Sequence, residues 1–276
     1  MLVECVPNIS EGRDLPLLDS FAARLVPLLD RSSDPDHNRT VFTFAGTPEA
    51  VLAQALSLAE AVFESLDINV HTGVHPRIGV LDVLPFVPVT GVSFEDCRAL
   101  ADRAAQQIWR QWQVPSFFYG AQHRPLEEVR RIAWGGAPPD TGHGRHLTAG
   151  AAAIGARPFL VAWNIWLQST DLVLAKNIAK NIRTLPGVKA LGFPLASRNL
   201  VQVSINSTDY QATPLPVIFE AVTRRARQAG VDVLGSELIG LIPERAYHPG
   251  LRWLNWNDNM IFERRYSSCS VGNLSA

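Results

Sequence analysis

The sequence predicts an α/β protein of the α+β kind, with two ferredoxin-like subdomains that each contain a mixed sheet. Residues 2–119 alternate apolar strand patterns with helical patterns in the order β-α-β-α-β-α-β. Residues 159–235 give the order β-α-β-β-α-β, the split βαβ pattern of a ferredoxin-like fold. A segment rich in glycine and proline, 120–157, separates the two series. We therefore predict an N-terminal subdomain at 1–150 and a C-terminal subdomain at 151–276.

Helices in the first half are indicated by their capping residues. Thr47 and Pro48 supply an N-cap and a first-turn proline, and Ser93 with Asp96 matches a capping box. Pro27 should end the first helix early, because proline interrupts a helix interior. The predicted strands are 2–7, 41–45, 78–89 and 116–119, and the predicted helices are 14–29, 48–63 and 93–112.

The second half shows the same kinds of pattern. Leu174, Ile178 and Ile182 recur every four residues, which indicates the buried face of a helix that Pro186 and Gly187 end. The predicted strands are 159–167, 188–194, 200–205 and 231–235, and the predicted helices are 170–185 and 213–230.

The composition argues against several classes of protein. With 276 residues, of which 47% are hydrophobic, the chain is typical of a globular protein rather than a disordered one. Its 25 basic and 26 acidic residues give a net charge of −1, which offers no support for nucleic-acid binding. No apolar run approaches the roughly 18 residues of a membrane span, and the chain start lacks the apolar region of a signal peptide. Three cysteines without a CxxC pair favour a reduced, cytoplasmic location.

Two histidines, His71 and His75, lie in a stretch that cannot be a regular helix, because Gly73, Pro76 and Gly79 interrupt it. A loop histidine beside a cleft is suited to general acid–base catalysis near neutral pH. Two other interpretations stay open, an exposed loop histidine and a pair of metal ligands. The metal pair is disfavoured, since the helical i, i+4 geometry is broken and no glutamate lies between the histidines. We therefore predict no metal.

Two further polar clusters occur at 6–13 and at 34–40. The first follows a predicted strand, and ligand groups collect at strand ends in α/β sheets. Its alternative role is structural, with Ser10 or Asp14 capping the next helix. The second cluster is rich in Asp, Pro and Asn, so an ordinary turn is its alternative.

Taken together, these clusters resemble the formiminotransferase domain of glutamate formiminotransferases. The matching stretches are VECVPNISEGRD at 3–14, DPDHNRTVFTFAGTPEAV at 34–51, HTGVHPRIGVLDVLPFVPV at 71–89, GARPFLVAWNI at 155–165 and VLGSELIGLIP at 233–243. The pair of patterns HxGxHPRIG and PNxSEG is specific. The likeness covers most of the chain, in order.

The resemblance implies two α/β subdomains whose sheets flank a ligand cleft or tunnel that binds folate. It implies transfer of a formimino group from N-formimino-L-glutamate to N5 of tetrahydrofolate, in histidine degradation and one-carbon metabolism. Tetrahydrofolate would be the co-substrate, with no metal. The expected partners are small molecules, without nucleic acid or membrane, and a homodimer is a base-rate expectation. The chain is expected to lack a cyclodeaminase domain.

The resemblance also implies roles for individual residues. His75 matches the catalytic histidine, which would take a proton from N5 and give one to the departing glutamate nitrogen. Arg39 and Arg77 would bind carboxylates, with Asn8 and Asn38 as polar positioning groups. The folate-binding loop aligns with 141–150, where the predicted contacts are Thr141, Gly142, His143, Thr148 and Gly150.

The sequence departs from the family at Ser32, where an acidic residue is common two positions after the one matching Asp30. Asp34 and Asp36 are candidates to replace it. This departure leaves two alternatives to formimino transfer. One is an enzyme with another donor, for formyl transfer or 5-formyltetrahydrofolate turnover. The other is a non-catalytic paralogue that binds folate or a small anion.

Overall fold

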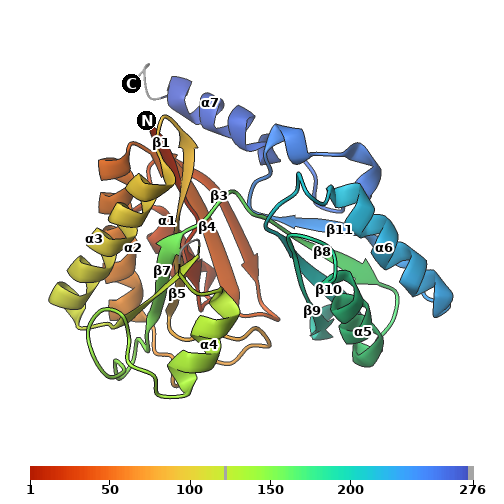
Figure 1. Ribbon diagram of the computed structural model, residues 1–276, viewed down its shortest axis with the longest axis horizontal. Coiled ribbons are helices and arrows are strands. Elements are labelled where there is room, and N and C mark those ends of the chain that lie inside the picture. Colours follow the sequence, from red (N-terminus) through yellow and green to blue (C-terminus); the bar gives the residue numbers. More distant parts are fainter. Residues whose placement is uncertain (121–122, 273–276) are drawn as a thin grey trace. The chain divides into compact units, whose positions relative to one another are not determined.

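The computed structural model describes residues 1–120 and 123–272 of the chain. It divides into two units, Met1–Arg157 and Pro158–Ala276, each with its own sheet and hydrophobic core (Figure 1). The division follows a strand that the sequence prediction assigned to the second subdomain, because that strand pairs within the first sheet. Within the described residues, no helix is long and apolar enough to span a bilayer.

The first unit is built on a seven-stranded mixed sheet. Strands β1 and β2 both lie between β4 and β5, as one strand interrupted at Val6 and Pro7. β3 extends the sheet beyond β4, and β7 and β6 follow β5 in two parallel pairings. The strands are β1 (Leu2–Cys5), β2 (Asn8–Ile9), β3 (Leu28–Asp34), β4 (Arg39–Gly46), β5 (Leu81–Thr90), β6 (Ser116–Gly120) and β7 (Ala152–Ala156).

Helices cover both faces of this sheet. Neighbouring strand residues point to opposite faces, so Leu84 packs in the core with α1, α2 and α3, while Val83 packs with α4. The predicted cap at Thr47 and the capping box of Ser93 and Asp96 are confirmed. The helices are α1 (Leu15–Ala22), α2 (Pro48–Ser65), α3 (Phe94–Trp112) and α4 (Leu126–Trp134).

A β-bulge in β5 positions the one acidic side chain of that strand. Asn8 pairs with Val83 and Ile9 pairs with Leu81, so Asp82 is an extra residue without a partner on β2. A bulge re-aims the side chain that it carries. Here it allows a carboxylate to be buried inside an otherwise apolar strand.

The second unit has the predicted ferredoxin-like topology. Its sheet order is β11-β8-β10-β9, with every neighbouring pair antiparallel, so only the first sheet is mixed. Trp163 is fully buried in the core between this sheet and two helices, α5 (Leu172–Ile182) and α6 (Leu215–Gln228). The elements are β8 (Val161–Leu167), α5 (Leu172–Ile182), β9 (Val188–Leu195), β10 (Leu200–Ser207), α6 (Leu215–Gln228), β11 (Val233–Ile239), α7 (Phe262–Gly272) and the 3₁₀ turns Ala196–Arg198, Glu244–Ala246, Pro249–Leu251 and Asp258–Met260.

The predicted fold class is confirmed, but several elements differ from the prediction. The first helix ends at Ala22; residues 23–27 form turns, and the last two residues predicted to be helical, Leu28 and Leu29, begin the edge strand β3, which pairs with β4. The glycine- and proline-rich segment contains α4 and β7 rather than loop alone. Four of the five residues of β7 are alanine or glycine, which have little intrinsic strand preference. At position 155 only glycine fits, because a Cβ there would lie 2.0 Å from the carbonyl oxygen of Tyr119.

Candidate active site

The three polar clusters of the sequence converge at Asn38. Its Oδ1 accepts a hydrogen bond from the Gly12 amide (2.8 Å), and its Nδ2 donates to the Thr72 carbonyl (2.9 Å). Asn38 has a φ of +47°, a conformation that asparagine tolerates better than most residues. The side chain therefore holds three chain segments together, and we assign it a positioning role.

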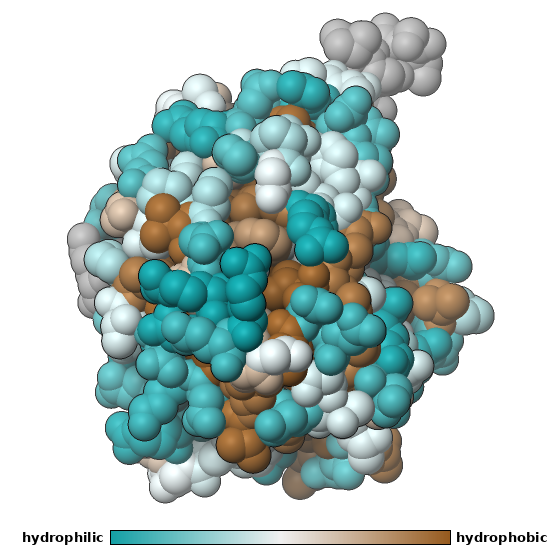
Figure 2. Space-filling model, turned by 90° about the vertical axis from the view of Figure 1, so that its right-hand side faces the viewer, coloured by the Kyte–Doolittle hydropathy of each residue, from teal (hydrophilic) through white to brown (hydrophobic). Residues whose placement is uncertain are grey.

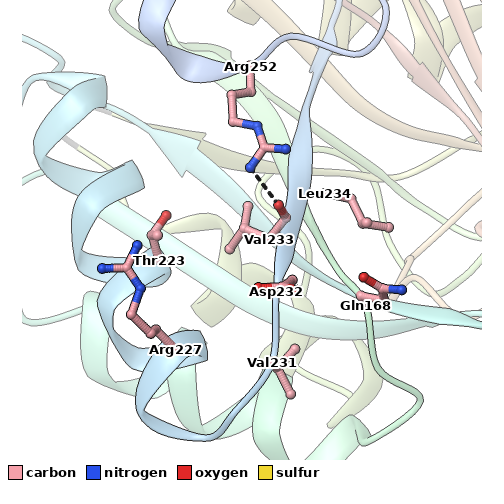
Figure 3. A pocket seen from close by; sticks show the side chains of 8 residues that line it. All are labelled: Gln168, Thr223, Arg227, Val231, Asp232, Val233, Leu234 and Arg252. Atoms are coloured by element: carbon pink, nitrogen blue, oxygen red, sulfur yellow. Dashed lines mark hydrogen bonds between the residues drawn. The ribbon is translucent and has the colours of Figure 1, made fainter.

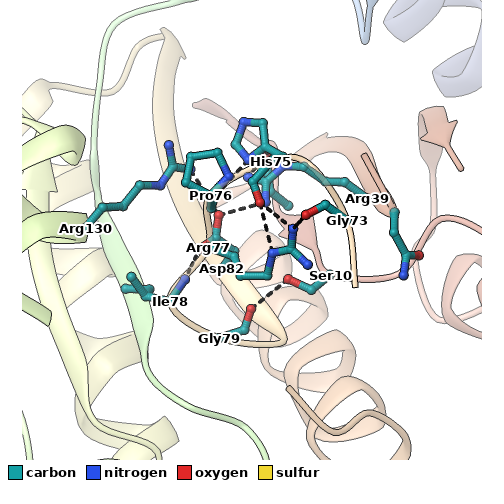
Figure 4. A network of polar contacts seen from close by, with 12 residues as sticks. Ser10, Arg39, Gly73, His75, Pro76, Arg77, Ile78, Gly79, Asp82 and Arg130 are labelled. Carbon is teal, nitrogen blue, oxygen red and sulfur yellow. Dashed lines mark hydrogen bonds and ion pairs between the residues drawn. The ribbon is translucent and has the colours of Figure 1, made fainter. Parts of the chain in front are cut away.

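His75 lies partly buried at the centre of a polar network (Figure 4). Its Nδ1 is 2.8 Å from the carbonyl oxygen of Pro76. Because a carbonyl can only accept, Nδ1 carries the proton and Nε2 is the basic nitrogen of the neutral ring. Burial and the charges of Arg39 and Arg130 place the pKa of His75 well below its ordinary value. At neutral pH the ring is therefore an uncharged base.

Asp82 connects two arginines in this network. Its side chain is 1% exposed and accepts from Arg39 Nη1 (2.7 Å), from Arg130 Nη2 (3.1 Å) and from the Ile78 amide (2.7 Å). Burial alone would raise the pKa of Asp82, but the two guanidinium groups lower it to about 2. Two positive charges thus face one negative charge. The cluster has a net positive charge that suits an anionic ligand.

The arginines differ in how many of their donors the protein uses. Arg39 Nε and Nη2 donate to Asn8 Oδ1 (3.1 and 2.8 Å), in addition to the bond with Asp82. In contrast, Nε of Arg130 is buried and has no hydrogen-bond partner among the described residues. Arg130 therefore has the greater capacity to bind a further carboxylate.

Arg77 stabilises the loop around His75. Its Nη2 donates to the Gly73 carbonyl (2.6 Å), its Nε donates to the His75 carbonyl (3.0 Å), and its Nη1 contacts the ring of His71. Nε2 of His71 in turn lies 2.8 Å from the Asn38 carbonyl oxygen. Arg77 and His71 thus fix the loop that presents His75.

The start of the predicted folate-binding loop, 141–150, is fixed by β6 and α3. Thr141 exchanges two backbone hydrogen bonds with Ser116 (3.0 and 3.1 Å). His143 packs edge-on against Trp109, with ring centroids 4.8 Å apart. These two loop residues therefore have contacts within the first unit.

The end of the same loop is anchored beside β5. The Thr148 carbonyl accepts from the Ile68 amide (2.8 Å). Gly150 has a φ of +76°, and a Cβ there would lie 2.5 Å from the carbonyl oxygen of Ile78. Glycine is therefore required at this position for both reasons.

Replacing Gly142 with alanine is expected to destabilise the first unit more than the same change at Gly144. Both glycines have positive φ values, +82° and +67°, so both substitutions carry a left-handed backbone cost of about 1–2 kcal/mol. Only at Gly142 would the new Cβ meet a neighbour, 2.3 Å from Cε3 of Trp109, which adds about 1–3 kcal/mol of overpacking. Denaturant unfolding of the two variants measures this difference. Equal losses of stability in the two variants would contradict the close packing of Gly142 against Trp109.

A cavity of about 380 Å³ lies next to this loop in the first unit. Ile78, Trp134, Gly144 and Arg145 are among its lining residues, most of which are apolar or glycine. The Arg145 guanidinium lies 4.1 Å from the centroid of the Trp134 ring, and Trp134 Nε1 donates to the Arg77 carbonyl (2.8 Å). The cavity wall is thus bonded directly to the loop that carries His75.

A second cavity, of about 360 Å³, lies in the second unit near the end of α6 (Figure 3). Arg227 and Arg252 are among its lining residues, and Arg252 Nη1 donates to the Val233 carbonyl (2.9 Å). It contains none of the predicted site residues. On the face of the molecule drawn in Figure 2, hydrophobic patches interrupt a mostly hydrophilic surface. Among residues 1–120 and 123–272, no group of three or more His, Cys, Asp or Glu side chains is arranged to hold a metal ion.

Comparison with known proteins identifies the family. A model described as the formiminotransferase domain, N-terminal subdomain, matches residues 2–157, and one described as the formiminotransferase domain matches residues 162–262. The chain belongs to the formiminotransferase family. The resemblance inferred from the sequence is thereby confirmed.

Curated members of the formiminotransferase family are similar over most of the chain. Glutamate formimidoyltransferase of Streptococcus pyogenes serotype M1 is 38% identical over 269 residues, which cover 89% of this chain and 90% of that protein. The enzyme of the same name from Thermoplasma acidophilum is 36% identical, with 89% of each chain covered. Formimidoyltransferase-cyclodeaminase of Sus scrofa is 37% identical over 89% of this chain, but this chain spans only 51% of its length.

In this formiminotransferase, the structure also shows site residues that the sequence analysis did not identify. Asp82, Arg130 and Trp134 were all missed. The sequence did contain a signal for Asp82. It is the one acidic residue in an apolar strand pattern, and because a buried carboxylate is costly without partners, it indicates that positively charged or hydrogen-bonding groups lie nearby. Arg130 and Trp134 had none, since both lie in α4, within the glycine- and proline-rich segment 120–157 for which the sequence predicts no helix. Of the two candidates to replace the acidic family residue, Asp34 binds His37, as described below.

Proposed function

We propose that the chain transfers a formimino group from N-formimino-L-glutamate to N5 of tetrahydrofolate, as a glutamate formimidoyltransferase of histidine degradation. The observation that carries this proposal is His75, a neutral base next to a buried cluster with a net positive charge. Both substrates are carboxylates, which such a cluster attracts. Identity of 38% with a glutamate formimidoyltransferase supports this choice of donor and acceptor. A cytoplasmic location and a homodimer stay predictions.

In this proposal His75 carries out both proton transfers. Tetrahydrofolate, when bound, supplies the nucleophilic nitrogen N5. Nε2 of His75 takes the proton that N5 loses as the new C–N bond forms, and returns it to the glutamate nitrogen as the old C–N bond breaks. The Pro76 carbonyl keeps a proton on Nδ1 throughout, so Nε2 stays the exchanging atom.

The cavity beside Trp134 has the properties of a folate site. Its volume of about 380 Å³ lies within the usual range for small-molecule pockets. Trp134 and Arg145 offer flat surfaces for a planar ring, and the bond to the Arg77 carbonyl joins the cavity to the His75 loop. We place folate there, with Gly144 and Arg145 as the contacts from the 141–150 loop.

Arg130 is the residue that we assign to binding the donor's carboxylate. Replacing Arg130 with glutamine should raise KM for formiminoglutamate by about 10- to 100-fold, the worth of a hydrogen bond to a charged group. Its Asp82 partner keeps the bond to Arg39, so the fold should be retained. Arg131→Gln, at an exposed position on the same helix, is the matched control and should leave KM unchanged. Steady-state kinetics with each substrate varied in turn makes the measurement, and equal KM values for both variants would exclude Arg130.

The reaction itself is tested with purified protein, tetrahydrofolate and formiminoglutamate. Acidification converts the formimino product to a methenyl derivative that is followed by absorbance. Formation of this product that depends on both substrates is expected. Folate binding without product would instead favour a non-catalytic binding protein, and product from a formyl donor alone would favour the other enzyme.

A further inference from the structure

A second histidine, His37, lies beside His75. The centroids of the two rings are 6.0 Å apart, with the ring planes at 56°. His37 is buried, with 7% of its surface exposed. It lies in the turn between β3 and β4, whereas His75 lies in the loop before β5, so the tertiary structure brings them together.

The carboxylate of Asp34 holds His37 in place. Nδ1 of His37 is 3.0 Å from Asp34 Oδ2, and the His37 backbone amide donates to Asp34 Oδ1 (2.7 Å). Burial alone would raise the pKa of Asp34, but the hydrogen bond and charge of His37 lower it. Asp34 is therefore ionised at neutral pH, next to an imidazole that it orients. A proton on His37 would have a negative charge beside it.

His75 has the opposite surroundings. Burial and the charges of Arg39 and Arg130 disfavour a proton on its ring, and the buried carboxylate of Asp82 opposes them. Arg77 and His71 lie in the same loop, where Arg77 contributes a further positive charge to the network. A proton taken up by His75 thus lies near two guanidinium groups, whereas the ring of His37 lies beside a carboxylate.

We propose that His37, held by Asp34, is a second proton-carrying imidazole of this site, which takes from His75 the proton that the acceptor nitrogen releases. Nδ1 of each ring is bound to a fixed acceptor, and ring centroids 6.0 Å apart keep the Nε2 atoms beyond direct hydrogen-bond distance, so the exchange runs between the Nε2 atoms through one water. The C–N bond to the acceptor forms, the proton passes from His75 to His37, and it returns through His75 to the glutamate nitrogen as the donor C–N bond breaks. One proton moves and none is gained or lost. The role in turnover rests on the proposed function.

The coupling of the two rings is tested without substrate, by NMR titration of histidine-labelled protein. In His37→Gln the titration midpoint of His75 should rise, because protonated His37 is one of the charges that lower the pKa of His75, after burial, Arg39 and Arg130. His248→Gln, a change in the second unit, is the control and should leave the His75 midpoint unmoved. An unmoved midpoint in His37→Gln would overturn the proposal.

Kinetics then tests the relay. His37→Gln and Asp34→Asn should each lower kcat by about 10²-fold, at the lower end of the range for general acid–base groups, with KM for both substrates nearly unchanged. The acid limb of kcat/KM should move to higher pH in His37→Gln, following His75. Asparagine at 34 keeps an oxygen for the His37 amide, so the turn is retained. Full kcat in both variants would overturn the relay, and an inactive wild-type protein with a shifted His75 midpoint would overturn the proposed function while the coupled pair stands.

Discussion

Replacing His75 with alanine is expected to lower kcat by about 10²- to 10⁴-fold, because the variant loses the group that removes and returns the transferred proton. KM for both substrates should change little, since the ring's role is in proton transfer rather than in binding carboxylates. The acidification assay for the methenyl product measures the loss. His248→Ala, which changes a histidine of the second unit, is the matched control.

The pH dependence of the wild-type enzyme provides an independent check on His75. Its pKa lies well below the ordinary value, because burial and two arginines disfavour the charged ring. The basic form is therefore present at and above pH 6.5, and kcat/KM should fall only at more acidic pH. A His75→Ala variant with full kcat, or an acid limb unchanged by that substitution, would show that another group is the base.

Replacing Asp82 with asparagine is expected to destabilise the first unit by about 3–5 kcal/mol, because it leaves the buried guanidinium of Arg39 without its counter-charge. Asparagine retains an oxygen for the Ile78 amide, so the substitution removes the charge with little change in shape. Denaturant unfolding measures the loss, and hydrogen exchange in β4 and β5 assigns it to the first unit.

The control for Asp82 is an ion pair on the surface. Glu49 and Arg103 lie 2.7 Å apart with both side chains largely exposed, so Glu49→Gln should cost less than about 1 kcal/mol. Similar losses for Glu49→Gln and Asp82→Asn would contradict a buried network.

The stability of the first unit should also depend on pH through Asp82. Its pKa is about 2 in the folded protein and 3.8 without perturbation, so the folded state favours the ionised form. This contribution, about 2 kcal/mol, is complete above about pH 5 and is lost as pH falls towards 2. In Asp82→Asn this part of the acid dependence should disappear.

Local sequence patterns predicted the second unit well and the first unit less completely. The order β-α-β-β-α-β follows from apolar periodicity and from proline and glycine stops, which are local features. β3 was missed because an edge strand pairs on one side only and tolerates polar residues such as Arg31 and Ser33. β7 was missed because its position between β5 and β6 depends on small size, which no periodicity reveals.

By itself, the sequence determined the family and the α+β class and predicted His75 as the catalytic residue, because these depend on residue identities and on local patterns. Only the tertiary structure decided which charges pair with which. Arg39, Asp82 and Arg130 lie far apart in the chain and meet through a bulge in β5 and a helix that the sequence did not predict. The same applies to His37 and His75. The protonation of these groups depends on burial and on neighbouring charges, and both are set by long-range packing.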